Sequence, residues 1–316
     1  MEVLLRLSGL LALLLIGTGL RRGGVLNRRR TSTLNTVAYY GALPALVFTA
    51  TYDRNVVAIL TPELFVGVLG VFALTVALAW LVTRRRSNPA RRSVTMVQSY
   101  HSNLGYLGLP LVDATFGSEV TAVASVVLGI GSLIQVPITV LLLVTTTGVT
   151  TQLRSQFLQL GKNPVLIALV AGIAVGSLQP TVPTVSTVVP DVLAALAPVS
   201  TVVLEALATL ALPLALVCVG ASLEVDGPTL DFGATGSVVG LKLIAMPVIA
   251  WAIFSTLGIN GAAFTAGIVM FGTPTAVSTY VFATELGGDE QFASLNVFVT
   301  TLVSLASMFV LIRLVS

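Results

Sequence analysis

The chain carries very little charge. Only 9% of its 316 residues are Asp, Glu, Lys or Arg, whereas 55% are hydrophobic and the mean hydropathy is +0.99. A soluble protein of this length needs several times more charge at its surface, so the composition excludes a soluble fold. Apolar runs long enough to cross a hydrocarbon core of about 30 Å recur along the chain. They predict an all-α integral membrane protein with little mass outside the bilayer.

Reactive and metal-binding side chains are also scarce. Cys218 is the only cysteine and His101 the only histidine, so the chain cannot form an internal disulfide and has no paired histidines for a metal. An intramembrane serine hydrolase would need a nucleophilic serine and a histidine base on facing spans, and no Gly-x-Ser-x-Gly sequence occurs. We therefore expect no enzyme activity, no metal and no cofactor.

Ten apolar segments predict ten membrane spans. They are 3–20, 31–51, 62–82, 94–115, 120–144, 164–178, 198–223, 236–257, 262–284 and 292–314. A polar connection at 146–162, expected in the cytoplasm, separates a first half of five spans (1–145) from a second half of five spans (163–316). Residues 190–196 are expected to form a short interfacial lead-in to the seventh span. The first segment could be a secretory signal, but arginines follow its apolar run and no clear cleavage site appears, so we interpret it as a span.

The two halves share a pattern of prolines. Pro44 in span two follows a leucine, as Pro213 does in span seven. Pro44 stands 66 residues before Pro110, and Pro213 stands 61 residues before Pro274. Because each half has an odd number of spans, the second half must enter the membrane inverted. The pattern therefore predicts two inverted repeats, related by a pseudo-two-fold axis in the membrane plane.

Spans four and nine contain residues that are unfavourable inside a helix. Gly105, Gly108 and Pro110 lie within six residues of each other, and span nine contains Gly272 and Pro274. Proline lacks a backbone donor and clashes with the preceding turn, and glycine adds backbone freedom. The freed backbone groups cannot face lipid, so each break must be buried in protein or line a wet cavity. A matched pair of interrupted spans is the best sequence indication of a transporter's binding site. We expect spans four and nine to cross near the midplane in a secondary transporter.

The distribution of basic residues predicts the orientation. Arginine clusters follow spans one and three, and Arg154 and Lys162 follow span five. By the positive-inside rule these loops are cytoplasmic and both termini lie outside. The clusters are Arg21, Arg22, Arg28, Arg29 and Arg30, then Arg84, Arg85, Arg86, Arg91 and Arg92. The loops after spans seven and nine are acidic instead, with Glu224, Asp226, Asp231, Glu285, Asp289 and Glu290. Acidic residues contribute little to topology, so the prediction stands; binding of lipid is the alternative role for the arginines.

Motifs in three spans identify a family. In span four, Asn103 stands seven residues before Pro110 of a Gly-Leu-Pro-Leu element, and Ala-Thr-Phe-Gly follows. In span nine, Tyr-Val-Phe-Ala and then an acidic residue follow Pro274, and in span eight Lys242 stands five residues before Pro247. In this order the motifs resemble those of the auxin efflux carrier family, which includes plant PIN-type carriers and prokaryotic relatives described as malate permeases. Unlike in the plant long-loop carriers, the connection between the halves is short, so the resemblance does not imply auxin itself.

The resemblance implies a scaffold domain and a transport domain that carries the crossed helices. It implies transport of a small organic anion, such as a carboxylate or an auxin-like acid, across the plasma membrane by alternating access, through either an elevator or a rocking motion. Family analogy alone points to a homodimer; membrane lipid is a partner and nucleic acid is not.

An anionic substrate also agrees with the physics of the breaks, because helix N-termini at a break present free N–H groups and Asn103 adds a donor without a fixed charge. The candidate substrate-binding residues are Asn103, Gly105, Gly108, Pro110, Gln135, Gly272, Thr273, Pro274, Thr275 and Ser278. The alternative for Asn103 and Gln135 is an interhelical hydrogen bond.

A few further polar residues are candidates for charge or coupling. Lys242 is an intramembrane cation, with a snorkelling stem as the alternative. Glu205 could carry a coupling proton if buried, or lie near the outer interface. His101 could titrate near neutral pH, or be a polar residue near the cytoplasmic entry of span four. Asp113 could bind an ion or lie at the outer mouth, and Asn296 could lie at the interface.

The alternative function is a sodium- or proton-coupled transporter of the bile-acid symporter or cation antiporter type, which would share the crossed architecture. An antiporter needs ionisable carboxylates at the crossing, and only Asp113 stands near either break. A sodium symporter needs a richer set of Asn, Gln and Glu ligands. The identity of the substrate, the direction of transport and the choice between uniport and ion coupling stay open at this point.

Overall fold

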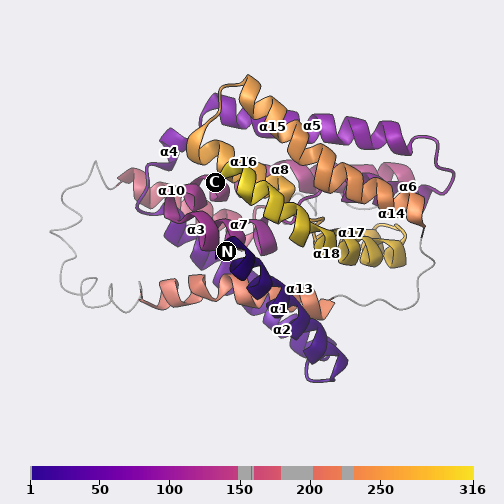
Figure 1. Ribbon diagram of the computed structural model, residues 1–316, viewed down its shortest axis with the longest axis horizontal. Helices are drawn as coiled ribbons and strands as arrows, with labels where there is room; N and C mark the ends of the chain where they lie inside the picture. Colours follow the sequence, from indigo (N-terminus) through magenta and orange to yellow (C-terminus); the bar gives the residue numbers. More distant parts are fainter. Residues whose placement is uncertain (1, 149–157, 159, 179–201, 223–230) are drawn as a thin grey trace.

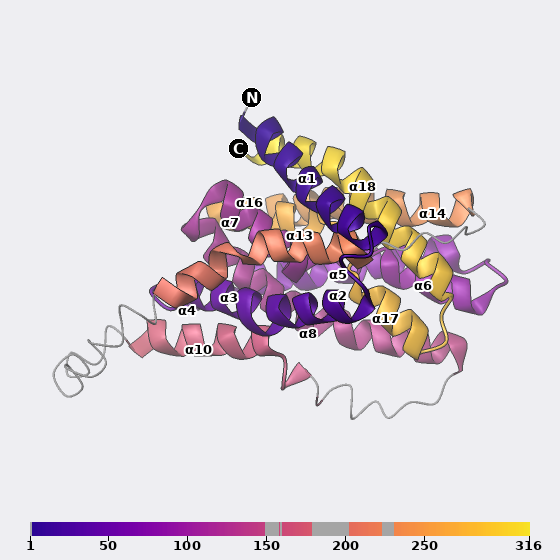
Figure 2. The same cartoon turned by 90° about the horizontal axis from the view of Figure 1, so that it is seen from below.

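The computed structural model describes residues 2–148, 158, 160–178, 202–222 and 231–316. Within these ranges the chain is helical, apart from turns, short loops and one isolated antiparallel β-bridge between Ser102 and Thr275. The expected interfacial segment at 190–196 and most of the connection at 146–162 lie outside the described residues. Figures 1 and 2 both place the two ends of the chain close together.

Five helices are long and apolar enough to cross a membrane. They are α5 (Pro62–Thr83), α8 (Ser118–Thr147), the helix Val202–Ala221, the helix Phe232–Thr256 and α18 (Glu290–Val315). Three shorter apolar helices are Leu104–Phe116, Pro164–Ser177 and Gly261–Gly272. The fold is thus that of a polytopic membrane protein, and each of the ten expected segments contains helix.

The remaining helices complete these segments. Span one is α1 (Glu2–Arg22), and span two consists of α2 (Arg28–Val37), η1 (Ala38–Ala42) and α3 (Leu43–Thr51), followed by the short α4 (Val56–Ile59). Span four consists of α6 (Pro89–Gln98), η2 (Leu104–Gly108) and α7 (Leu109–Phe116), and span six is α10 (Pro164–Leu178). Span seven ends in α13 (Ala211–Ser222), and span eight consists of α14 (Phe232–Val239), η3 (Gly240–Ala245) and α15 (Met246–Thr256). Span nine consists of α16 (Gly261–Gly272) and α17 (Ser278–Glu285).

Three prolines widen a helix instead of breaking it. The π-helical turns η1, η2 and η3 each end immediately before a residue–proline pair, and these prolines are Pro44, Pro110 and Pro247. In each case the residue before the proline donates its N–H to the carbonyl five positions back, as Leu109 does to Leu104. Proline has no N–H and clashes with the carbonyl four positions back, and the wider turn relieves both problems. Pro110 was expected at the break of span four, but it lies inside the helix that follows the break.

The helices pack in two groups. In one group α1 packs on α13 and α10 packs on α3; in the other, α5, α6, α8, α15, α16 and α18 pack on one another (Figure 1). Within the first group the contact of α1 with α13 is backbone to backbone, because Gly17 faces the carbonyl of Val217 and Gly220 faces the carbonyl of Leu14. The groups meet mainly where α8 contacts α3 and where η2 contacts α13.

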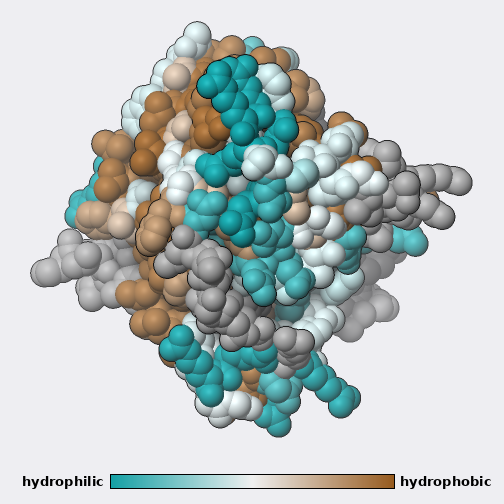
Figure 3. All heavy atoms as spheres, turned by 90° about the vertical axis from the view of Figure 1, so that its right-hand side faces the viewer, coloured by the Kyte–Doolittle hydropathy of each residue, from teal (hydrophilic) through white to brown (hydrophobic). Residues whose placement is uncertain are grey.

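One end of the molecule is hydrophilic. Figure 3 shows polar side chains gathered on the end where the α5–α6 and α17–α18 loops lie. There the Arg91 guanidinium lies 2.9 Å from the Asp289 carboxylate and 3.5 Å from that of Asp231. The N–H of Ala234, bonded to Asp231, together with Arg86 and Arg91 holds the pKa of the Asp231 carboxyl below its usual range. The acidic residues Asp231 and Asp289 therefore lie on the same end as the arginine cluster at 84–92 and are paired with it.

We expect Gly220→Ala to lower the midpoint of thermal unfolding in detergent by several degrees. A Cβ at this position would overlap the carbonyl group of Leu14, and overpacking of this kind costs about 1–3 kcal/mol. Gly236→Ala is the matched control, because a Cβ there meets no atom within 4 Å. Equal midpoints for the two variants would contradict the close approach of α1 and α13.

Candidate functional site

The two interrupted spans meet at their breaks. Span four is non-helical between α6 and η2, and span nine is non-helical between α16 and α17. The N–H of Asn103 donates to the carbonyl of Pro274 at 2.9 Å, and the N–H of Ala276 donates to the carbonyl of His101 at 3.0 Å. The Thr275 hydroxyl also donates to the His101 carbonyl at 3.3 Å. Each break thus satisfies backbone groups of the other, as a membrane interior requires.

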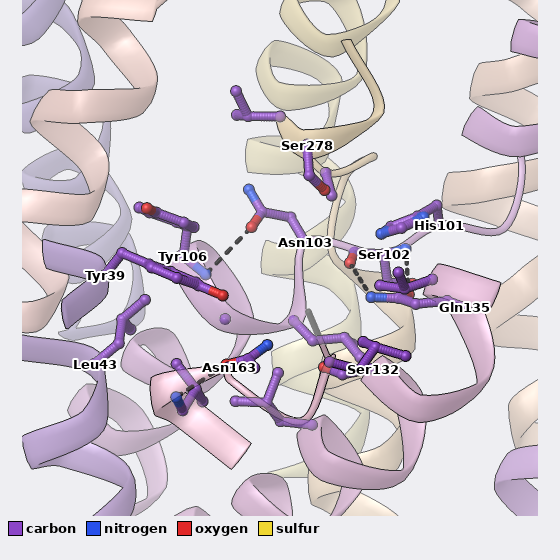
Figure 4. Close-up of a pocket in the computed structure, with 18 of the residues that line it drawn as sticks. Tyr39, Leu43, His101, Ser102, Asn103, Tyr106, Ser132, Gln135, Asn163 and Ser278 are labelled. Carbon is purple, nitrogen blue, oxygen red and sulfur yellow. Dashed lines mark hydrogen bonds between the residues drawn. The ribbon is translucent and has the colours of Figure 1, made fainter. Parts of the chain in front are cut away.

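A glutamine from α8 completes the pairing of the first break. The Ser102 N–H donates to Oε1 of Gln135 at 3.1 Å, and Nε2 of Gln135 donates to the Ser102 carbonyl at 3.3 Å (Figure 4). The side-chain amide therefore binds both backbone groups of one residue, as a neighbouring strand would. Since an unsatisfied buried group costs about 1–3 kcal/mol, this contact stabilises the break.

A cavity of about 250 Å³ lies against the crossing. Its wall includes the start of the helix after the first break, from Asn103 to Tyr106, and the start of the helix after the second break, from Ala276 to Ser278. The other lining residues are Tyr39, Leu43, His101, Ser102, Leu128, Ser132, Gln135, Val136, Leu160, Asn163, Val165 and Phe282. Both helices therefore direct their N-terminal ends toward one cavity, where the partial charge of a helix is positive.

Asn103 lies where the two helix starts meet. Its Oδ1 accepts the N–H of Tyr106 at 3.2 Å and so caps the helix, while its amide nitrogen points the other way (Figure 4). The side chain is only 4% exposed, yet it lines the cavity. Asn103 therefore offers a neutral hydrogen-bond donor beside two helix N-termini.

Comparison with known proteins agrees with this architecture. Residues 3–312 match the family described as "Membrane transport protein". The chain belongs to this family, the auxin efflux carriers. It is also 26% identical over 302 residues to an "Uncharacterized transporter" from Methanothermobacter thermautotrophicus, and the alignment covers 94% of this chain and 93% of the relative. The carrier is therefore a membrane transporter of this family and not a member of an enzyme family.

The cavity of the carrier brings together some of the expected site residues and leaves others behind its wall. Asn103, Gly105, Gln135, Ser278 and His101 line it. The rest of the expected substrate-binding set is buried around the crossing: Gly108, Pro110, Gly272, Thr273, Pro274 and Thr275. The hydroxyls of Thr273 and Thr275 donate to backbone carbonyls, those of Met270 and His101. In this conformation these two threonines brace the crossing.

The candidates for charge or coupling lie in different environments. His101 is 2% exposed, and its Nδ1 lies 2.7 Å from the Thr139 hydroxyl. Glu205 and Asp113 are exposed, and Asp113 accepts a hydrogen bond from Thr121. Lys242 is completely buried, so the snorkelling interpretation is wrong.

Asn296, for which an interfacial position was one possibility, is also completely buried. Its amide nitrogen donates to Gln98 at 2.8 Å, and Nε2 of Gln98 donates to the Thr279 hydroxyl at 3.0 Å and to the carbonyl of Ala293 at 2.9 Å. This network ties the end of α6 to α17 and α18. Because Gln98 stands before the break and outside the motifs of span four, its role could not be predicted from the sequence.

The cavity has an aromatic side that was not predicted from the sequence. The rings of Tyr39 and Tyr106 stack with centroids 6.5 Å apart, and the Tyr106 hydroxyl donates to Oδ1 of Asn35 at 2.6 Å. A second cavity of about 270 Å³ lies on this pair and shares Tyr39, Tyr106, Val277 and Ser278 with the first. Asn163, which stands directly before Pro164 at the start of α10, also lines the first cavity. In the sequence, only the position of Tyr106, three residues after Asn103, indicated that it could lie at the site.

We expect Gln135→Leu to lower the thermal midpoint of the purified carrier by several degrees. The change leaves the N–H and carbonyl of Ser102 without their side-chain partner, at a cost of about 1–3 kcal/mol for each buried group. Ser132→Ala is the control, since Ser132 lies on the same helix and lines the same cavity. A midpoint for Gln135→Leu equal to that of the control would mean that the amide does not brace the break.

Proposed function

We propose that the carrier moves a small organic anion, such as a carboxylate or an auxin-like acid, across the plasma membrane by alternating access. One observation carries the proposal: the N-terminal ends of both helices that follow the breaks line the same cavity. Helix N-termini stabilise anions through free N–H groups and the helix dipole. The cavity volume of about 250 Å³ suits a small molecule.

The side chains at the cavity support an anion over a cation. Asn103 and Ser278 provide neutral donors, and we assign both to the substrate site together with Gly105 and Gln135. The buried side chains within the described ranges include no Asp or Glu. A cation antiporter would need such a carboxylate at the crossing, and these residues offer no group of three acidic, histidine or cysteine side chains for a metal ion.

The two packing groups support the alternating-access part of the proposal. In it, ten spans form two inverted repeats, 1–145 and 163–316, with spans four and nine crossing at the cavity. The group that contains α1, α3, α10 and α13 is the scaffold, and the group that contains α6, α8 and α16 is the transport domain. Residues from both groups line the cavity, as Tyr39 and Asn103 do, so movement of one group against the other would expose the site to alternate sides.

The hydrophilic end of the molecule is the cytoplasmic side in this proposal, with both termini outside. The arginines at 84–92 support this orientation, and the pairing of Arg91 with Asp289 and Asp231 accounts for acidic residues on the same side. A negative-inside membrane potential drives a monoanion outward with about 2.3 kcal/mol per 100 mV. Efflux of such an anion needs no coupling ion.

We expect a carboxylate substrate to raise the thermal midpoint of the purified carrier, while its uncharged analogue does not. A ligand that binds only the folded state stabilises it by mass action. The measurement is a thermal-shift screen of small carboxylates and matched amides, with and without sodium. In Asn103→Ala the shift should be lost, because the variant removes a donor at the helix starts.

Asn260→Ala is the matched control for this screen, since Asn260 is exposed and does not line the cavity. It should retain the shift. Stabilisation by sodium alone, without a response to any anion, would favour the sodium-coupled alternative and contradict the anion proposal.

We expect a cysteine at Ser87 to react with a membrane-impermeant maleimide only after cells are permeabilised, and a cysteine at Glu119 to react in intact cells. Both positions are exposed; Ser87 lies in the loop between α5 and α6, and Glu119 lies at the start of α8. The two substitutions are made in a Cys218→Ala background. The reverse labelling pattern would invert the proposed orientation.

A further inference from the structure

Lys242 is a completely buried basic residue that does not line the cavity. Its Nζ donates to the carbonyl of Phe271 at 2.8 Å and lies 3.3 Å from the sulfur of Met246. Phe271 belongs to the last turn of α16, directly before the second break. The same Met246 sulfur lies 3.6 Å from the Ser102 hydroxyl in the first break. The ammonium group is therefore held close to both breaks from the side of span eight.

The charge of Lys242 is only partly balanced by its surroundings. The end of a helix carries about half a negative charge on its free carbonyl groups, so α16 offsets part of the ammonium charge. Within the described ranges no carboxylate is buried, and the ion pairs found there do not include Lys242. A buried charge without a full counter-charge is costly. A second negative charge near the crossing would therefore be stabilised.

We propose that Lys242, in its ammonium form, supplies the positive charge that sets the affinity of the crossing for anions, acting through space and not by contact. The inference rests on the proposed function, because the substrate anion in the cavity is the missing counter-charge. The helix starts and Asn103 orient the carboxylate by hydrogen bonds, and Lys242 supplies the net charge that these neutral groups lack. Its hydrogen bond to Phe271 keeps the charge beside the breaks. Lys242 itself belongs to span eight, which lines no part of the cavity.

Charge dependence separates this role from a structural one. A through-space charge changes the binding free energy in proportion to the charge of the ligand, whereas a loss of packing weakens all ligands alike. Succinate, succinamate and succinamide form a suitable series, because they share one carbon skeleton and carry charges of two, one and zero. Each is measured by isothermal titration calorimetry on the full chain in detergent, using the wild type and Lys242→Gln, which can still donate a hydrogen bond to Phe271.

In Lys242→Gln we expect the Kd to rise about tenfold for succinamate and about a hundredfold for succinate, with no change for any binding of succinamide. Coulomb's law gives about a tenfold change in Kd for each unit of ligand charge. This order holds when the ligand charge and the ammonium group lie a few side-chain lengths apart at an effective dielectric constant of about 20. Lys242→Arg, which keeps the charge, should retain the difference between the two acids. An equal loss for both acids overturns the inference and leaves the proposed function standing. If none of the three compounds binds the wild type, the proposed carboxylate site fails and the inference fails with it.

A second variant keeps the test valid if Lys242→Gln does not give a monodisperse protein. Lys242→Met combined with Met246→Lys moves the ammonium group to the neighbouring position, one helical turn along and still beside Ser102. We expect this double variant to bind succinate more tightly than Lys242→Met alone, by about a hundredfold. If the double variant binds succinate no more tightly than Lys242→Met, the inference is overturned.

Discussion

The pairing of two helix breaks inside the bilayer is the constraint on which the rest of the structure depends. A non-helical backbone cannot face hydrocarbon, because each unpaired N–H or carbonyl costs several kcal/mol there. The breaks at His101–Asn103 and around Pro274 solve this problem for each other through two backbone hydrogen bonds, and Gln135 supplies the remaining partners for Ser102. Spans four and nine must therefore cross at one point, and span five must lie beside them.

This crossing also creates the electrostatics of the site. Four helix ends meet there, and the two N-terminal ends, which begin at Leu104 and Ser278, line the cavity. A C-terminal end, that of α16, is bound by Lys242 through the Phe271 carbonyl. The two kinds of ends are thus separated, and no Asp, Glu, Lys or Arg side chain among the described residues lines the cavity. Under the proposed function, such a wall binds an anion through helix N-termini and neutral donors, so the anion can also be released.

Much of this arrangement could be predicted from the sequence, but not the position of the first break. The spans follow from local hydropathy, and α10 begins and ends where the sequence predicted. Pro110 was expected at the break, yet a π-helical turn before it accommodates the missing donor and the clash, so the helix continues. The break lies upstream at residues 101–103, where no glycine or proline marks it. Its extended conformation is stabilised by Pro274 and Ala276, which are distant in sequence, so no local signal could reveal it.

The sequence by itself determined that the chain is a membrane protein, where its spans lie, that two of them are interrupted and which family it belongs to, because hydropathy and motif spacing are local properties. Only the tertiary structure decided which polar side chains face the cavity and which brace the crossing. Asn103 and Thr275 are both polar residues beside an expected break, but one lines the cavity and the other donates to the His101 carbonyl. Likewise, the burial of Lys242 and Asn296 depends on packing between spans eight, nine and ten and the broken span four. A polar side chain in a membrane takes its role from the partner that satisfies it, and that partner is fixed only when distant spans come together.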